Sequence, residues 1–322
     1  MTNILFTCIG RRVSLLKSFR RAAKLLKINI SLLGTDTTVL SSALQLCDKK
    51  FVVKPTTHPG YVKQLLNIVR ANSVKLLVPT VDLDLKILAQ NKSRFAELGC
   101  CVLISSVQVV DICQDKRKFY RFLVNNGFDA PRTMTVRTAL STGKLKKPCF
   151  LKPWDGYASR GNVVVSRRKE LLFFSKRIPN CIVQEFIKGV EHTCDVYVDF
   201  GMNVRCVIPR KRIEVRAGEV SKGQTVKHLR IMSEAAGLVE AIGAGPGVIT
   251  VQLFLTEDGK IKFIEVNPRF GGGVPLSIKA GANFPKWILQ ELLGKRTSIK
   301  FDGFKNNLIM LRYDDEIWLE GS

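Results

Sequence analysis

Four polar side chains near the carboxyl-terminal end have the types and spacing to hold a divalent cation beside a phosphate: Gln252, Glu265, Asn267 and Arg269. A carboxylate and two amide oxygens are hard ligands that suit Mg²⁺, which completes its shell with water and substrate phosphates. The arginine offers a planar fork for phosphate or carboxylate. The alternative is a solvated polar strand face that carries a Glu–Arg pair.

A β-hairpin is the element that must bring these side chains together. Two β-rich runs are separated by Asp-Gly at 258–259, a dipeptide typical of a two-residue turn. This turn predicts that Glu257 pairs with Lys260 and that Gln252 lies opposite Glu265. Because side chains alternate along a strand, the asparagine and the arginine share the face of the glutamate.

The residues around this face fit the same interpretation. Alternation turns Ile264 and Val266 toward a core. Pro268 and the three glycines at 271–273 follow the second strand, and a glycine-rich turn allows a ligand to approach the backbone closely.

The first 110 residues predict a parallel sheet covered on both faces. Short apolar runs at 4–9, 30–33, 51–53, 76–78 and 102–104 read as strands. Between the first two, apolar residues recur every three or four positions, as in a helix: Val13, Leu16, Phe19, Ala23 and Leu26. This alternation of strands and helices is typical of an α/β domain.

The remaining residues, 111–322, predict a second domain with an α+β texture. Asp111 could cap a helix that stops at Asn126-Gly127. After Pro131 the strands come closer together and only two clear helical stretches interrupt them, which favours antiparallel hairpins.

Composition excludes several classes of protein. With 46% hydrophobic and 24% charged residues the chain is an ordinary globular one, and its apolar runs are too short to span a bilayer. Positive charge follows the first apolar run, the reverse of a secretory signal, so we expect a cytoplasmic protein. The nine cysteines include no Cys-x-x-Cys spacing, which argues against a zinc ribbon or a disulfide framework.

The chain resembles the ATP-grasp superfamily. EVNPRFGGG followed by VPLSIKAGAN is similar to the carboxyl-terminal signature of these enzymes, closest to short, single-copy relatives of the carbamoyl phosphate synthetase large subunit. The resemblance implies a Rossmann-like pre-ATP-grasp domain over 1–110 and an ATP-grasp domain over 111–322, with a lid subdomain over roughly 130–187.

The resemblance also implies which residues contact nucleotide phosphates. Lys116, in QDKRKF, and Lys152, at the end of CFLKP, stand where the family keeps its phosphate-binding basic residues. The segment after Lys152 resembles the glycine-rich flap over the β- and γ-phosphates, in which Gly156, Ser159 and Gly161 are expected to take part. The flap holds fewer glycines than the richest family loops.

IVQEFIKGVEHTCDVYVD resembles the hinge that binds adenine and ribose. By this likeness the backbones of Glu185 and Ile187 contact the adenine edge, and Glu191 takes the ribose hydroxyls. Gln184 could face the same pocket. The alternative is that the polar alternation of this strand marks a solvent face.

The resemblance makes Glu265 and Asn267 metal ligands, with Gln252 as a neutral third ligand that leaves the occupancy of one position open. We therefore expect ATP and one or two Mg²⁺ ions, with Mn²⁺ as a substitute. Arg269 and Lys152 are the expected catalytic residues, which stabilise the transferring phosphoryl group.

A basic segment, 209–223, is open to two interpretations. Its cations could bind an anionic substrate, or they could belong to a solvated loop: Arg210, Lys211, Arg212 and Arg216.

The activity that the resemblance implies is ligation of a small-molecule carboxylate to an amine through an acyl phosphate, with release of ADP and phosphate. It also allows a homodimer. One alternative is phosphoryl transfer or carbamoyl-phosphate-type chemistry. Another is a basic nucleic-acid-binding protein on a degenerate grasp fold, supported by the net charge of +24. The charge is dispersed along the chain, and aromatic residues make up only 8%, so nucleic acid is not expected as a partner.

Overall fold

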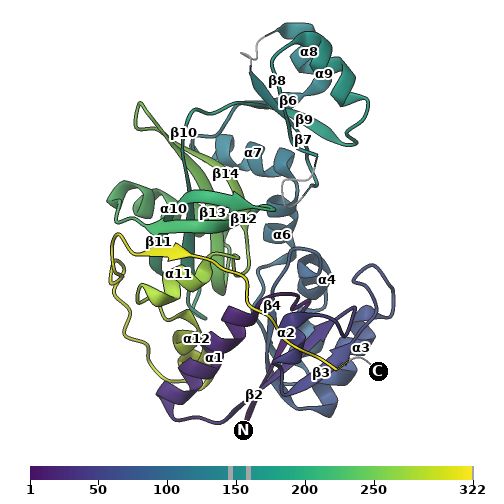
Figure 1. Ribbon diagram of the computed structural model, residues 1–322, viewed down its shortest axis with the longest axis vertical. Helices are drawn as coiled ribbons and strands as arrows, with labels where there is room; N and C mark the ends of the chain where they lie inside the picture. Colours follow the sequence, from purple (N-terminus) through teal and green to yellow (C-terminus); the bar gives the residue numbers. More distant parts are fainter. Residues whose placement is uncertain (144–147, 157–160, 321–322) are drawn as a thin grey trace.

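The computed structural model describes residues 1–143, 148–156 and 161–320, and its strands form sheets of five, six and four strands. Figure 1 shows the four-stranded sheet at the top of the molecule and the five-stranded sheet at the bottom, with the six-stranded sheet at the height between them. The site described below lies on the six-stranded sheet.

The amino-terminal sheet is parallel and has the strand order β3-β2-β1-β4-β5. The chain builds outward from β1 through β2 to β3, then crosses to β4 on the other side of β1. The elements of this part are β1 (Thr2–Thr7), α1 (Val13–Leu26), β2 (Ile30–Asp36), α2 (Ser42–Gln45), β3 (Lys49–Val52), α3 (Tyr61–Ala71), β4 (Val74–Pro79), α4 (Leu85–Gln90), α5 (Lys92–Ala96) and β5 (Cys101–Val102).

Both faces of this sheet are buried, as expected. Ile4 and Phe6 of β1 belong to one apolar cluster with α1, while Leu5 between them belongs to another with α3. The predicted helix stripe is confirmed, since α1 buries Leu16 and Phe19. Helix α1 also packs against α11 (Val274–Lys279) and α12 (Phe284–Leu292) of the carboxyl-terminal part.

Two short helices follow where one was expected. Ser106 caps α6 (Val107–Gln114) and Asp115 caps α7 (Lys116–Asn125) through their side chains. The expected cap at Asp111 is wrong, because Asp111 lies inside α6, where it binds Lys86 and Lys118. The chain breaks between the helices because Asp115 is extended and accepts hydrogen bonds from the next turn.

The four-stranded sheet has the order β6-β9-β7-β8 and carries two helices on one face. Its elements are β6 (Thr133–Thr135), α8 (Val136–Thr142), β7 (Cys149–Pro153), β8 (Val163–Val165), α9 (Arg168–Ser175) and β9 (Cys181–Glu185). Leu151 and Val183 pack beneath α8 and α9. Alternation therefore puts Lys152 and Gln184 on the opposite face.

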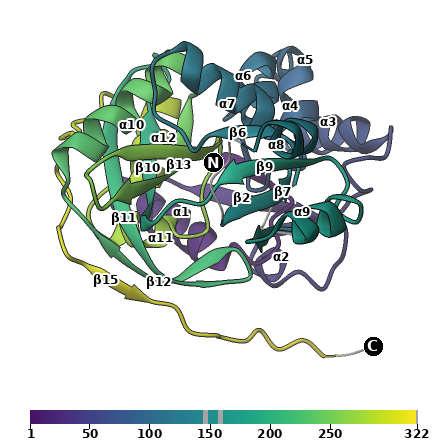
Figure 2. The same cartoon turned by 90° about the horizontal axis from the view of Figure 1, so that it is seen from above.

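The six-stranded sheet is antiparallel in the order β14-β13-β10-β11-β12-β15. Its elements are β10 (Gly189–Val198), β11 (Val204–Arg216), β12 (Glu219–Thr225), α10 (Leu229–Ile242), β13 (Gly247–Thr256), β14 (Ile261–Asn267) and β15 (Ile309–Leu311). The segment after β15 runs along one side of the molecule (Figure 2). No helix among the described residues is both long and apolar enough to cross a membrane, and the nine cysteines are free thiols.

Candidate active site

The hairpin of β13 and β14 places the candidate metal ligands. Gln252 lies opposite Glu265, as predicted, and Thr250 lies opposite Asn267. Gln252 also lies opposite Thr193 of β10, so the polar face continues across the sheet.

The register near the turn differs from the prediction. The Thr256 N–H donates to the Lys260 carbonyl at 2.9 Å, and Gly259 has a left-handed φ of +77°. The predicted pairing of Glu257 with Lys260 is therefore wrong, because the turn takes three residues and ends in a left-handed glycine.

A β-bulge at Ile264 restores the predicted register further along the hairpin. Leu253 pairs with Phe263 and Gln252 pairs with Glu265, so Ile264 is the additional residue. Phe263 and Val266 are buried, whereas Ile264 is only half-buried, so the expectation that it points into the core is wrong. Because of the bulge, Leu253 and Phe263 are buried in the core while Glu265 stays opposite Gln252 on the polar face.

The donor set at this position fits Mg²⁺. Among the described residues the Glu265 carboxylate has no ion pair or hydrogen bond, while Gln252 and Asn267 supply amide oxygens on the paired strands. Within the described ranges, no three His, Cys, Asp or Glu side chains converge as a metal cluster. A single carboxylate with amide oxygens is a donor set that Mg²⁺ completes with substrate phosphates.

Lys152 of β7, in the four-stranded sheet, lies within electrostatic range of this carboxylate. Its side chain is only 9% exposed. Burial and the positive charge of Lys116 lower the pKa of Lys152 to about 8, and the negative charge of Glu265 partly offsets that fall. Lys152 is therefore close enough to both groups, which come from two other elements, for their charges to act on it.

Lys116 begins α7 and is tied to the segment after β7. Its N–H donates to the Trp154 carbonyl at 3.0 Å, and its Nζ donates to the Gly156 carbonyl at 2.5 Å. Gly161 has a left-handed φ of +73°, which favours glycine there. The expected contact of Ser159 lies outside the described residues.

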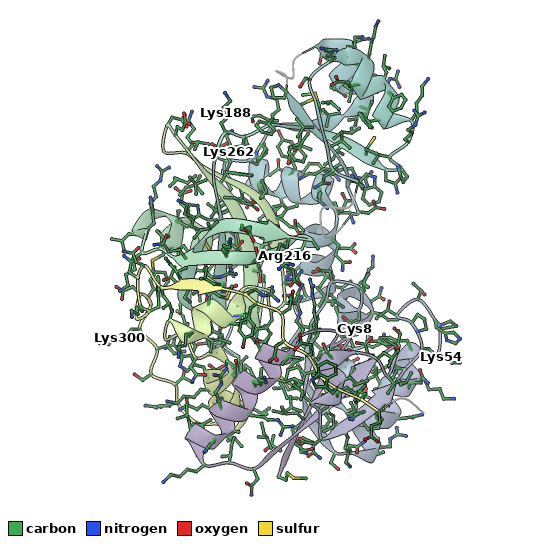
Figure 3. All side chains as sticks on the ribbon, viewed as in Figure 1. Cys8, Lys54, Lys188, Arg216, Lys262 and Lys300 are labelled. Carbon is green, nitrogen blue, oxygen red and sulfur yellow. The ribbon has the colours of Figure 1, made fainter. Side chains whose placement is uncertain are left out.

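The expected adenine hinge links β9 to β10. The Glu185 N–H donates to the Arg132 carbonyl at 2.8 Å, so a contact between its backbone and a base has to use the carbonyl oxygen. The Glu185 carboxylate lies 3.4 Å from Lys262 Nζ. Gln184 donates to Thr133 at 2.8 Å, and Ile187 is half-buried in the connection. Figure 3 shows Lys188 and Lys262 together at this end of the sheet.

Glu191 forms an ion pair with Arg212, which the sequence analysis named only as one cation of the basic segment. Arg212 NH1 lies 2.5 Å from Glu191 Oε1 and 3.3 Å from Gln252 Oε1. Its Nε is buried without a hydrogen-bond partner in the described residues. Burial raises the pKa of Glu191, although Arg212 and its hydrogen bond oppose the rise. Arg212 thus joins the ribose candidate to the metal face.

The basic segment 209–223 is not a loop. It forms β11 and β12, so alternate cations take opposite faces. Arg210 and Arg212 are two positions apart, and such residues share one face of a strand. This spacing is the signal in the sequence that could have placed Arg212 on the polar face. The solvent-face alternative for β10 is also wrong, since Thr193 and Asp195 are buried.

Arg210 is a packing residue. It is buried and binds both oxygens of Asp195 at 2.8 and 2.9 Å, and Ser277 donates to the same carboxylate. For this arginine neither interpretation of the basic segment holds, because its guanidinium is buried and already paired with a buried carboxylate.

The triple glycine accommodates side chains of the chain itself. A Cβ on Gly273 would overlap the Arg210 guanidinium, one on Gly272 would stand 2.7 Å from the Glu219 carboxyl carbon, and one on Gly271 would stand 2.8 Å from Thr250. The expectation of a ligand against these glycines is replaced by close packing on the sheet.

Arg269 connects the metal face to the amino-terminal sheet. Its NH2 lies 2.5 Å from Asp82 Oδ2, and its Nε lies 3.2 Å from the same oxygen. Asp82 follows β4. The pKa of Arg269 is raised despite burial, which lowers it, because Asp82 and Glu265 stabilise its charge. Arg269 therefore lies between the candidate metal ligands and the edge of the parallel sheet.

Residues 113–273 match the family of the ATP-grasp domain, and residues 4–103 match the PylC-like N-terminal domain. A carbamoyl phosphate synthase large chain from Thermoanaerobacter sp. is 26% identical over 232 residues, which cover 65% of this chain and 21% of that one. The chain thus spans about a fifth of the length of this relative.

Solved structures confirm the expected fold of a parallel amino-terminal domain and an antiparallel grasp domain. The biotin carboxylase domain of Hydrogenobacter thermophilus 2-oxoglutarate carboxylase, solved as a dimer with MgADP and bicarbonate, has a TM-score of 0.76 at 15% identity and covers 95% of this chain and 73% of that one. An L-amino acid ligase from Bacillus licheniformis has a TM-score of 0.73 at 21% identity, covering 95% and 78%.

Proposed function

The chain belongs to the ATP-grasp family, and we propose that it is an ADP-forming carboxylate–amine ligase. The observation that carries the proposal is the polar face of the β13–β14 hairpin, where Glu265 lies opposite Gln252, with Lys152 of β7 in electrostatic range of Glu265. Cations opposite a carboxylate suit a magnesium–triphosphate complex, in which both signs of charge need partners.

In the proposed first step, an oxygen of the carboxylate substrate attacks the γ-phosphorus of ATP. The bond from that phosphorus to the β–γ bridging oxygen breaks, and ADP leaves with the electron pair. Lys152 and Arg269 stabilise the charge on the transferring phosphoryl oxygens. Glu265, Gln252 and Asn267 would hold magnesium, which would supply positive charge against the phosphates.

In the second step the amine nitrogen attacks the acyl carbon. A C–N bond forms, the C–O bond to phosphate breaks, inorganic phosphate leaves, and the nitrogen loses a proton to solvent. The chain needs no covalent nucleophile for this sequence, because its residues only position the reactants and stabilise charge. A homodimer is part of the proposal, supported by the dimer that the biotin carboxylase domain of similar fold forms.

Thermal unfolding with and without Mg·ATP tests the nucleotide site. A ligand at 100 times its Kd adds about 2.7 kcal/mol to the stability of the folded state. We expect a Tm rise that needs both ATP and Mg²⁺ and that is lost in Glu265→Ala. Glu257→Ala changes an exposed glutamate in the turn of the same hairpin and should keep the full rise.

Product analysis then tests the reaction. ADP and phosphate should appear only when a carboxylate and an amine are both supplied, and an amide should form in equal amount. A folded wild-type protein whose Tm does not change when Mg·ATP is added would contradict the proposal. Acyl phosphate or carbamoyl phosphate as the released product would favour the phosphoryl-transfer alternative.

A further inference from the structure

A group of arginines lies at the junction of the amino-terminal sheet and the grasp domain. The Glu219 carboxylate lies 3.3 Å from Arg11, 3.1 Å from Arg12 and 3.0 Å from Arg312. Burial lowers the pKa of Arg12, and so do the positive charges of Arg269, Arg11 and Arg312, while Glu219 opposes the fall. Arg269 is therefore near enough to Arg12 to count as a fourth guanidinium of the group. We call these four arginines the junction cluster.

The junction cluster holds more positive charge than its own carboxylates neutralise. Four guanidinium groups form ion pairs with only two carboxylates, those of Glu219 and Asp82, and a third carboxylate, Glu265, acts on Arg269 without direct contact. Arg12 and Arg269 are only 17% and 14% exposed, so water screens their repulsion weakly. Like charges gathered at a half-buried position are costly unless an anion arrives to balance them.

The topology of the parallel sheet places a ligand crevice at the same position. In open α/β sheets ligands bind at the carboxyl ends of the strands, where the strand order reverses. Here that point lies between β1 and β4, the two central neighbours. Arg11 and Arg12 follow β1, and Asp82 follows β4. The loop with these arginines starts at Cys8, on the side of the sheet that faces the grasp domain (Figure 3).

The cluster also adjoins the reactive end of the candidate active site. Arg269 follows the candidate ligands of β14 by two residues, and Glu265 acts on its charge. An anion held by the arginines would therefore lie beside the position of the transferred phosphoryl group.

We propose that the junction cluster binds the acceptor substrate, and that this acceptor is a polyanion with at least one acidic group besides the carboxylate that is phosphorylated. The proposal rests on the ligase function proposed above. Glu219 occupies the arginines in the unliganded chain, and the acidic groups of the acceptor take its place. Arg11 and Arg312, at 62% and 36% exposure, are the partners with most freedom to reorient.

Binding of simple anions tests the cluster without knowledge of the natural acceptor. The probes are acetate, succinate, tricarballylate and 3-phosphonopropionate at constant ionic strength, with binding followed by calorimetry and by the Tm. We expect at least one polyanion to bind tenfold or more tightly than acetate. Arg12→Gln should weaken that binding about tenfold, and Arg11→Gln, at a more exposed position, should weaken it without risk to folding.

Glu219→Gln is the most informative variant, because it should have the opposite effect. Removal of the internal carboxylate should tighten polyanion binding severalfold, because it leaves the arginines less neutralised and free to pair with the added anion. Arg21→Gln, which removes an exposed arginine from α1, should change nothing. Unchanged binding in both arginine variants, or weaker binding in Glu219→Gln, would overturn the inference.

The Mg·ATP response of the same samples separates the two proposals. If the wild-type protein binds polyanions through the cluster but its Tm does not change with Mg·ATP, the anion site is supported and the proposed ligase function is contradicted. A normal Mg·ATP response with no polyanion bound more tightly than acetate would keep the nucleotide site and overturn the polyanionic acceptor.

Discussion

The ammonium group of Lys152 is less stable in the unliganded protein than in water. Burial and the neighbouring Lys116 disfavour its charge, and Glu265 compensates only in part. An arriving triphosphate would supply the missing negative charge. The ammonium charge of Lys152 is thus disfavoured until an anion lies beside it, so part of the binding energy of a phosphate comes from stabilising this charge.

Replacement of this lysine should separate stability from function. Lys152→Met should raise the free energy of unfolding at pH 7 by about 1–3 kcal/mol, because each unit of pKa shift corresponds to roughly 1.4 kcal/mol. The same variant should lose the Tm rise with Mg·ATP. Urea unfolding measures the first effect, and Lys169→Met, at an exposed position on α9, is the control.

The stability gain should depend on pH. The pKa of Lys152 is lower in the folded chain than in the unfolded one, so the folded state has the full cost below pH ~8 and loses it as the pH rises above that value. The difference between variant and wild type should shrink between pH 8 and pH 10. A constant difference over this range would contradict the assigned cause.

At the scale of elements, the hairpin of β13 and β14 sets the metal face by two local irregularities. The left-handed Gly259 closes a three-residue turn, and the bulge at Ile264 then shifts the register back. Because each step moves the strand by one residue, Glu265 returns to the position opposite Gln252. The turn and the bulge act as a pair.

The same substitution at two glycines should have opposite effects. Gly259→Ala should lower the free energy of unfolding by about 1 kcal/mol, because a side chain disfavours the left-handed conformation although no atom stands in its way. Gly237→Ala lies within α10 and also meets open space, so it should raise stability by about 0.5–1 kcal/mol. Equal effects of the two variants would refute the role of the turn geometry.

At the scale of the whole molecule, charge is the dominant feature. The net charge of +24 is distributed over all three sheets, and the junction cluster concentrates part of it between the amino-terminal sheet and the grasp domain. Repulsion within a molecule of high net charge opposes the compact state, and salt screens it.

Added salt should therefore stabilise the protein. We expect the Tm to rise by a few degrees as KCl increases from about 0.02 to 0.3 M, over which the screening length shortens from roughly 20 to 6 Å. Sucrose of equal osmolarity serves as the comparison for non-ionic effects. A Tm that falls with KCl would show that attractive ion pairs, such as those of Glu219, outweigh the net repulsion.

The sequence by itself determined features that depend on local pattern. The period of α1, the buried strands of the parallel sheet and the opposition of Gln252 to Glu265 follow from spacing and turn chemistry, and the structure confirms them. The family resemblance likewise rests on a contiguous motif, and residues 113–273 bear it out.

Only the tertiary structure decided which charges meet. Arg210 and Arg212 are two positions apart on one strand, yet one fills a buried pair with Asp195 and the other reaches the metal face. The junction cluster joins residues from both ends of the chain around Glu219. Electrostatic partnership depends on distance and burial across the fold, and no local pattern in the sequence encodes either.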